Sequence, residues 1–414
     1  MFAMRTSQSI FALGIMIFSL FSCDRPDSAG FDPDAPIPPL TLSGVARLFS
    51  ELPISAEQVR EVHDAVRAST EHGYDEEYLM QQLFDSPGTG VGSAPGQTRA
   101  SSYTRPMRDL IRERLSDRVK TRAGAEAEIE AFIASLSASG MQIYWPFSSS
   151  WDGETLPVIT FDPESEATAN KGYQLIPGPD GTLTVRETLV DEALARKRPV
   201  WVINGNDDSA YLSLEQLRRQ DPDWGKGGRV LVGRAPESPL SVRGETVTRA
   251  GGVRAGDDFR SLVLKDFKMK QHYDNWFRGA SEFWVKCGSV QGFYASTEAE
   301  MRLYQPTVTD FMISVHRDQL DVVLPFDAII ISDWTEQLDS FAFLIVEDDG
   351  GTRTSWKVDA TVKIQSKSYG FTVDIPYNQR DDIVWRGSLT SRYFEKYNGD
   401  PVHFGGVDVT FELR

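Results

Sequence analysis

The chain has 414 residues, of which 40% are hydrophobic and 11% aromatic, so it can build substantial cores and is not disordered throughout. A mean hydropathy of -0.33, with no internal apolar run of about 18 residues, excludes a polytopic membrane protein. A net charge of -17 argues against nucleic-acid binding, and two cysteines exclude a disulfide-stapled scaffold.

The N-terminus carries the pattern of an export signal. Arg5 precedes an apolar stretch at 10–21, which is about half the length needed to span a bilayer. The stretch ends in Leu20-Phe21-Ser22-Cys23. This ending resembles the lipobox of bacterial lipoproteins, which implies that residues 1–22 are removed as a signal peptide and that Cys23 is acylated on its sulfur. The alternative is an ordinary secretory signal with a chance cysteine.

Residues 23–40 are rich in proline and predict an extended tether between the lipid and a folded body. The expected partner of this end is a membrane, and the expected location is the bacterial cell envelope, facing the periplasm or the exterior. If Cys23 carries lipid, Cys287 has no partner in the chain. The alternation in 282–287 places Cys287 on an apolar strand face, so we expect a small buried hydrophobe rather than a nucleophile.

Two segments of different character follow the tether. Residues 41–140 contain no Trp and predict a helical domain, in which Ser55 and Gln58 form a capping box. Amphipathic helices are expected around Leu110 and Ile133. Residues 141–260 form a mixed α+β segment with apolar strands predicted at 156–161 and 199–203. We expect these two segments to be separate units.

The C-terminal segment, 261–414, has the clearest pattern. Apolar and polar residues alternate with period two in several stretches, which is typical of antiparallel sheets with one buried face. Two further apolar runs predict strands buried on both faces. The predicted strands are 311–315, 328–331, 341–346, 356–364, 371–375 and 407–413. The sequence therefore predicts an α+β protein with an N-terminal helical region, a mixed middle segment and a C-terminal antiparallel β-sandwich.

The body also resembles a group of uncharacterised bacterial envelope lipoproteins. The stretches that carry this resemblance are YDEEYLMQQLF, PVWVINGNDD and FWVKCGS. The resemblance implies an envelope location but no activity.

Known catalytic motifs are missing from the sequence. It contains no G-x-S-x-G elbow, H-E-x-x-H, P-loop or C-x-x-C motif, and its five histidines lack the spacing of a zinc site. We therefore expect a non-enzymatic binding or interaction module more than an enzyme. The alternative is an envelope hydrolase that uses paired carboxylates on a glycan. Its candidates are Asp152, Glu154, Asp162 and Glu164.

Acidic residues gather after two of the predicted strands. One group follows the strand 341–346 and the other follows 371–375. Because consecutive turns of an antiparallel meander alternate between ends, both groups are expected at the same end of the sandwich. Converging carboxylates could bind calcium, whereas the alternative is ordinary turn chemistry without any ion. The candidates are Glu347, Asp348, Asp349, Asp381 and Asp382.

One tryptophan is a candidate ligand-binding residue. Trp284 lies between Glu282 and Lys286 on the polar side of its predicted strand, where an exposed indole could stack on a glycan. Packing against the neighbouring helical domain explains it equally well, because tryptophan is highly buried on average.

Overall fold

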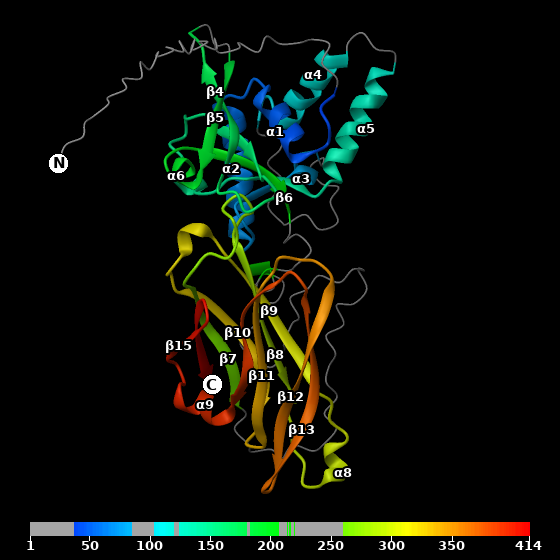
Figure 1. Cartoon of the computed structure of the whole chain (residues 1–414), viewed down its shortest axis with the longest axis vertical. Coiled ribbons are helices and arrows are strands. Elements are labelled where there is room, and N and C mark those ends of the chain that lie inside the picture. The colour runs from blue at the N-terminus through cyan, green and yellow to red at the C-terminus, as the bar shows by residue number, and fades with distance from the viewer. Residues whose placement is uncertain are drawn as a thin grey trace, which may run out of the picture. The chain divides into compact units, whose positions relative to one another are not determined.

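A computed structural model describes residues 37–84, 103–119, 124–179, 183–206, 213, 215–216, 219 and 260–414. These residues form an N-terminal α+β domain and a C-terminal antiparallel β-sandwich, which confirms the predicted fold class (Figure 1). All of them fall within the unit Pro33–Arg414. The predicted signal peptide, Cys23 and most of the predicted tether lie outside the described residues.

A six-stranded sheet with the order β1-β2-β6-β3-β4-β5 forms the centre of the N-terminal domain. Its strands are β1 (Glu77–Leu79), β2 (Met141–Tyr144), β3 (Val158–Phe161), β4 (Ala169–Pro177), β5 (Leu183–Asp191) and β6 (Val200–Gly205). Only β3 and β6 pair in parallel, and the other neighbours are antiparallel. Since β1 comes from the segment 41–140 and pairs with β2, the two segments expected to be separate share one sheet and one core.

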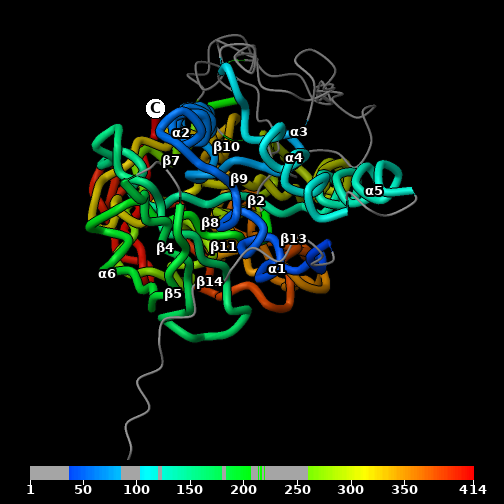
Figure 2. The backbone as a smooth tube through the Cα atoms, turned by 90° about the horizontal axis from the view of Figure 1, so that it is seen from above, coloured from blue at the N-terminus to red at the C-terminus, as the bar shows by residue number. Residues whose placement is uncertain are grey.

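Helices cover this sheet and build the larger of its two cores. They are α1 (Leu42–Ser50), α2 (Ala56–Glu71), α3 (Met80–Phe84), α4 (Met107–Val119), α5 (Ala125–Ser137) and α6 (Glu192–Ala195). The predicted capping box of Ser55 and Gln58 begins α2, and both predicted helices are present as α4 and α5, although the buried side of α4 includes Arg114 and Arg118 beside its apolar residues. α4 and α5 lie side by side, on the opposite side of the domain from α6 and the β4–β5 pair (Figure 2). The core buries Phe49, Trp145 and Trp201 completely or almost so.

The C-terminal domain packs a four-stranded sheet of order β10-β7-β16-β15 against a six-stranded sheet of order β13-β12-β11-β8-β9, in which β14 also pairs with β11. Its strands are β7 (Arg260–Met269), β8 (Ser281–Ser289), β9 (Thr307–Val315), β10 (Leu324–Trp334), β11 (Leu338–Glu347), β12 (Arg353–Ile364), β13 (Lys367–Asn378), β14 (Asp382–Thr390), β15 (Pro401–Phe404) and β16 (Val407–Leu413). The short helices of this domain are α8 (Glu298–Met301) and α9 (Ser391–Lys396), with a 3-10 turn at Arg317–Gln319; another 3-10 turn, Ser148–Ser150, lies in the N-terminal domain. All six strands predicted in this segment lie within observed strands.

Phenylalanines from both sheets meet in the sandwich core. The ring centroids of Phe267 and Phe283 lie 5.0 Å apart, and those of Phe343 and Phe411 lie 5.4 Å apart. Cys287 is a free, fully buried thiol in this core, as its strand position predicts.

The long β12–β13 pair is hydrogen-bonded to β11 at Leu338–Ser340 and folds over the rest of the sheet as a third layer. It covers the outer face of β8, β9 and β11, where it buries Trp284 together with Met312, Leu344, Val373 and Ile375. The expectation of an accessible Trp284 is therefore wrong, because the indole is only 3% exposed. Of the two interpretations, packing is correct, but the covering element is this strand pair rather than the helical domain.

A close contact between Gly288 of β8 and β13 yields a testable prediction. A methyl group on Gly288 would lie 2.7 Å from Cγ1 and 3.1 Å from Cβ of Val373. Because this overpacks a buried interface, we expect Gly288→Ala to lower the free energy of unfolding by about 1–3 kcal/mol in urea titrations. Gly205→Ala is the control, since a methyl group there meets no atom within 4 Å. Equal stability of the two variants would contradict the packed third layer.

Candidate metal centre

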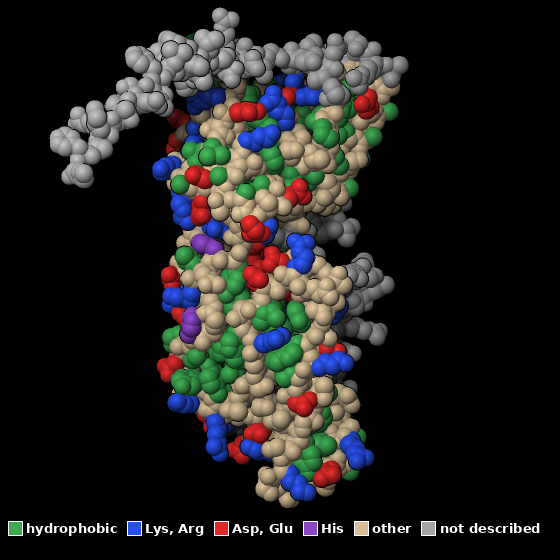
Figure 3. Space-filling model, in the orientation of Figure 1, with side chains coloured by type: hydrophobic (Ala, Val, Ile, Leu, Met, Phe, Trp, Pro, Cys, Tyr) green, Lys and Arg blue, Asp and Glu red, His purple; other side chains and the backbone are tan. Residues whose placement is uncertain are grey.

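The acidic side chains that could form a binding site in this protein are buried rather than exposed on its surface. On the face shown in Figure 3, acidic and basic side chains of the described residues are interspersed, so surface charge alone marks no site on that face. Beneath the surface, one ligand oxygen from each of Asp274, Glu282 and Glu347 lies within 4.8 Å of the other two. We call these three residues the carboxylate cluster.

Three elements position the carboxylate cluster. Asp274 lies in the loop 270–280 between β7 and β8, Glu282 lies near the start of β8, and Glu347 ends β11. β8 and β11 are antiparallel neighbours, and the backbone N–H of Asp348 donates to the carbonyl of Glu282 at 2.9 Å. Glu347 is paired with Phe283, so the side chains of Glu282 and Glu347 leave opposite faces of the ladder and meet at its end, where the loop brings the third carboxylate.

Glu347 is the most unusual member of the cluster. Its side chain is 0% exposed, and neither carboxylate oxygen accepts a hydrogen bond from any donor group among the described residues. The polar group beside it is the carboxyl of Asp274, which can share a proton with it but brings no positive charge. Buried carboxylates normally face hydrogen-bond donors or cations, so within the described residues no positive charge compensates Glu347 if it ionises.

Burial and neighbouring acids both oppose ionisation of the cluster. Burial, followed by the carboxyl of Asp274 and the charges of Asp349 and Asp382, raises the pKa of Glu347 to about 12. Burial also raises the pKa of Asp274, although Arg278 and Arg317 act in the opposite direction. Without an ion, Glu347 therefore holds a proton at neutral pH.

The donor set of the cluster suits a hard cation. All three ligands are carboxylates, and the cluster contains neither histidine nor cysteine. Calcium takes about six to eight oxygen ligands, and carboxylates can supply one or two each. A divalent cation would displace the proton of Glu347. Its positive charge would then balance the negative charge of the ionised carboxylate.

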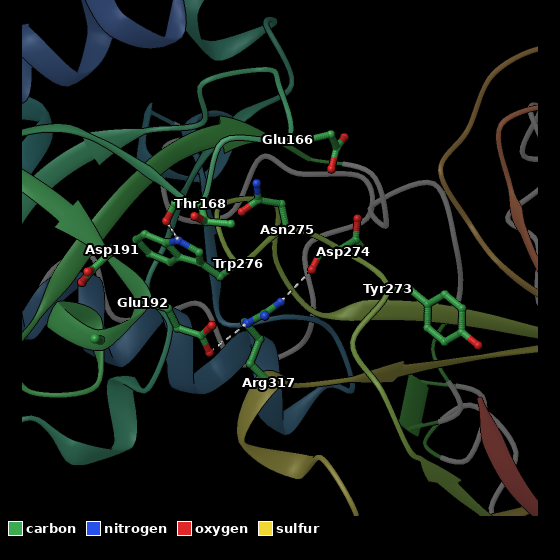
Figure 4. Close-up of a pocket in the computed structure, with 10 residues that line it drawn as sticks. Glu166, Thr168, Asp191, Glu192, Tyr273, Asp274, Asn275, Trp276 and Arg317 are labelled. Carbon is green, nitrogen blue, oxygen red and sulfur yellow. Dashed lines mark hydrogen bonds and ion pairs between the residues drawn. The ribbon is translucent and has the colours of Figure 1, made fainter. Parts of the chain in front are cut away.

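A pocket of about 390 Å³ reaches one member of the cluster. Asp274 lines it together with Trp276, Glu192 and Arg317. Arg317 lies between Glu192 and Asp274 in Figure 4. Its Nη1 donates to the carbonyl of Asp274 at 3.0 Å, and its Nε lies 3.5 Å from Oε1 of Glu192. The lining of this pocket includes Asp274 but neither Glu282 nor Glu347, so the pocket meets the cluster at Asp274.

The structure brings the two predicted acidic turns to the same end of the sheet. Glu347 is paired with Asp382 across the β11–β14 ladder, and Nδ2 of Asn378 donates to Oδ1 of Asp348 at 3.0 Å. Burial, followed by the charges of Asp274 and Asp382, raises the pKa of Asp349 to about 6. Only Glu347 of the five predicted ligands belongs to the carboxylate cluster.

Two of the predicted ligands also serve the local turns. Asp348 accepts hydrogen bonds from the indole of Trp284 and from the backbone of Gly350, each at 3.0 Å. Asp381 accepts from the backbone N–H of Asn378 at 2.7 Å. Their hydrogen bonds are those expected of turn chemistry, while calcium binding at this end stays a prediction.

The carboxylates considered for a hydrolase do not meet in one pocket among the described residues. Asp152 and Glu154 line a separate pocket of about 340 Å³, whose lining includes neither Asp162 nor Glu164. Hydrogen bonds from Thr155 lower the pKa of Asp152 to about 2, so this exposed acid is an ionised turn residue. Asp162 likewise accepts the backbone N–H of Glu164 at 2.9 Å.

Comparisons with known proteins place no relative beside this chain. No family model, no curated protein and no solved structure matches it. In the described ranges, no helix is both long enough and apolar enough to cross a membrane.

Proposed function

We propose that this protein is a lipid-anchored bacterial envelope protein whose folded body is a non-enzymatic module that binds a divalent cation, with calcium the expected ion. The lipobox-like ending at Cys23 supports the anchor. The observation that carries the binding function is the side chain of Glu347, which is fully buried beside two other carboxylates and, within the described structure, has no partner other than the carboxyl of Asp274.

Calcium is favoured over other ions by the geometry of the ligands. The three carboxylates come from a loop and two strands, and so supply oxygen ligands from three separate parts of the chain. Magnesium requires near-ideal octahedral geometry and keeps most of its water, whereas calcium accepts irregular shells of carboxylates. Zinc sites normally include histidine or cysteine, which the cluster lacks.

Isothermal titration calorimetry on the purified full-length protein in detergent tests this proposal. After treatment with a chelator, we expect one calcium ion to bind with a Kd below about 1 mM at pH 8, and magnesium to bind much more weakly. Proton release should make the observed heat depend on the buffer, because Glu347 must lose its proton to bind. No saturable binding at about ten times that calcium concentration would contradict the proposed function.

A further inference from the structure

We propose that the cation at the carboxylate cluster acts as a latch between the two domains, so that its binding tightens the docking of the N-terminal sheet on the β-sandwich. This inference rests on the proposed function. The latch consists of the loop 270–280, which contributes Asp274 to the cluster and, two residues later, inserts into the N-terminal domain.

The insertion is apolar and completely covered. Trp276 and Phe277 are 2% and 0% exposed, and they pack against Tyr144, Val158 and Val202 on one face of the N-terminal sheet. Fully burying an aromatic side chain stabilises a contact by about 1.5–3 kcal/mol, so this pair is a principal attachment between the domains.

Directional hydrogen bonds fix the same loop to the N-terminal domain. Nδ2 of the buried Asn204, on β6, donates to the carbonyls of Phe277 at 3.1 Å and Arg278 at 2.8 Å. The indole of Trp276 donates to the carbonyl of Thr168 at 2.9 Å. These bonds fix the register of the loop against the sheet, and so also the place from which Asp274 reaches the cluster.

A third contact closes the loop at its far end. Oδ2 of Asp75, which precedes β1, accepts the backbone N–H of Ala280 at 3.0 Å. Glu282 follows two residues later, so the chain between two cluster ligands is itself bonded to the N-terminal domain. The positions of Asp274 and Glu282 are thereby coupled to domain docking.

The effect of the ion follows from electrostatics. When an ion binds, Asp274 becomes connected through it to the ends of β8 and β11, which fixes the loop on the sandwich side. Without the ion, Glu347 keeps its proton, and the loop is held on that side by the proton shared between Asp274 and Glu347 and by contacts such as the one from Arg317 to the carbonyl of Asp274. An ion that binds best to the docked arrangement must stabilise docking, and docking must in turn strengthen ion binding.

Hydrogen exchange on the full-length protein, with calcium or with chelator, tests the latch. We expect calcium to slow amide exchange at least tenfold in β6 and in 276–280. Exchange in α4 and α5, whose buried residues belong to the other core of the N-terminal domain, should not change. Calorimetry on the same sample separates the two proposals. Calcium binding without this protection would overturn the latch alone, whereas absence of binding would overturn the proposed function and the latch together.

Because ion binding and domain docking strengthen each other, weakening the docking should weaken ion binding. A second experiment tests this with a residue outside the cluster. Asn204→Ala removes the bonds to the loop, and we expect it to weaken calcium binding about fivefold or more. Asn170→Ala is the matched control, because Nδ2 of Asn170 donates at 2.8 Å to the carbonyl of Phe161 within the N-terminal domain. Unchanged calcium affinity in a folded Asn204→Ala protein would contradict the coupling.

Discussion

Glu347→Gln should abolish calcium binding and, at the same time, make the metal-free protein more stable at pH 8. The amide keeps the shape of the side chain but removes the charge that a cation needs. We expect calcium affinity to fall by at least about 100-fold, which corresponds to about 2.7 kcal/mol. Titration calorimetry on both proteins measures this effect. The matched control is Glu336→Gln, in the exposed turn before β11, which should bind as the wild type does.

Glu347 should make the stability of the metal-free wild type depend on pH, and the direction of this dependence follows from its pKa. The pKa of Glu347 is about 12 in the folded protein and near 4.5 in the unfolded chain, so unfolding between these values releases a proton. Stability of the metal-free wild type should therefore fall as pH rises from 5 to 8, by up to about 1.4 kcal/mol per pH unit from this group. Glu347→Gln should lack this contribution, and Glu336→Gln should retain it.

Urea unfolding with chelator at several pH values measures these slopes. A slope that is the same in the wild type and in Glu347→Gln would mean that Glu347 is already ionised in the folded protein. That result would contradict the description of Glu347 as a buried acid without a compensating charge.

Cys23→Ser should move the protein from the membrane fraction to the soluble fraction of the envelope. Each buried CH₂ of an acyl chain contributes about 0.8 kcal/mol, and two or more chains give stable anchoring, so loss of the lipid should release the body almost completely. Cys287→Ala is the control, because that thiol lies in the sandwich core and should not affect anchoring. Cell fractionation and mass spectrometry of the N-terminal peptide give the readout. An unmodified thiol at Cys23 in the wild type would contradict the proposed anchor.

The sandwich could be predicted because its signal is local. In a stretch such as 356–364, apolar and polar residues alternate. This alternation alone predicts which side chains of the strand are buried, without information from other parts of the chain. The meeting of the two acidic turns could also be predicted, because hairpin connectivity alone decides which turns share an end. The burial of Cys287 followed from its strand position for the same reason.

Other features could not be predicted, because they depend on contacts between residues that are distant in sequence. β1, Glu77–Leu79, has three residues and carries no periodic pattern, so its pairing with β2 across the expected boundary near 140 had no sequence signal. Trp284 was assigned to a polar face because the covering pair β12–β13 begins about 70 residues later.

Glu282 and Asp274 were not predicted as cluster ligands, again because their contacts with Glu347 are distant in sequence. Glu282 belongs to the polar alternation of β8, and Asp274 lies in a loop without a metal-binding motif. The pairing of β8 with β11 places Glu282 beside Glu347, about 65 residues away, and the loop before β8 brings Asp274 to the same place. A buried acid at the end of a predicted apolar strand, as Glu347 is, was the available local signal.

Crystals of the protein grown with calcium, and with terbium as an anomalous substitute, test the central claim most directly. We predict a single ion about 2.3–2.6 Å from carboxylate oxygens of Asp274, Glu282 and Glu347. A cluster without an ion at saturating calcium, with the carboxyls of Asp274 and Glu347 bonded to each other through a proton, would contradict the claim.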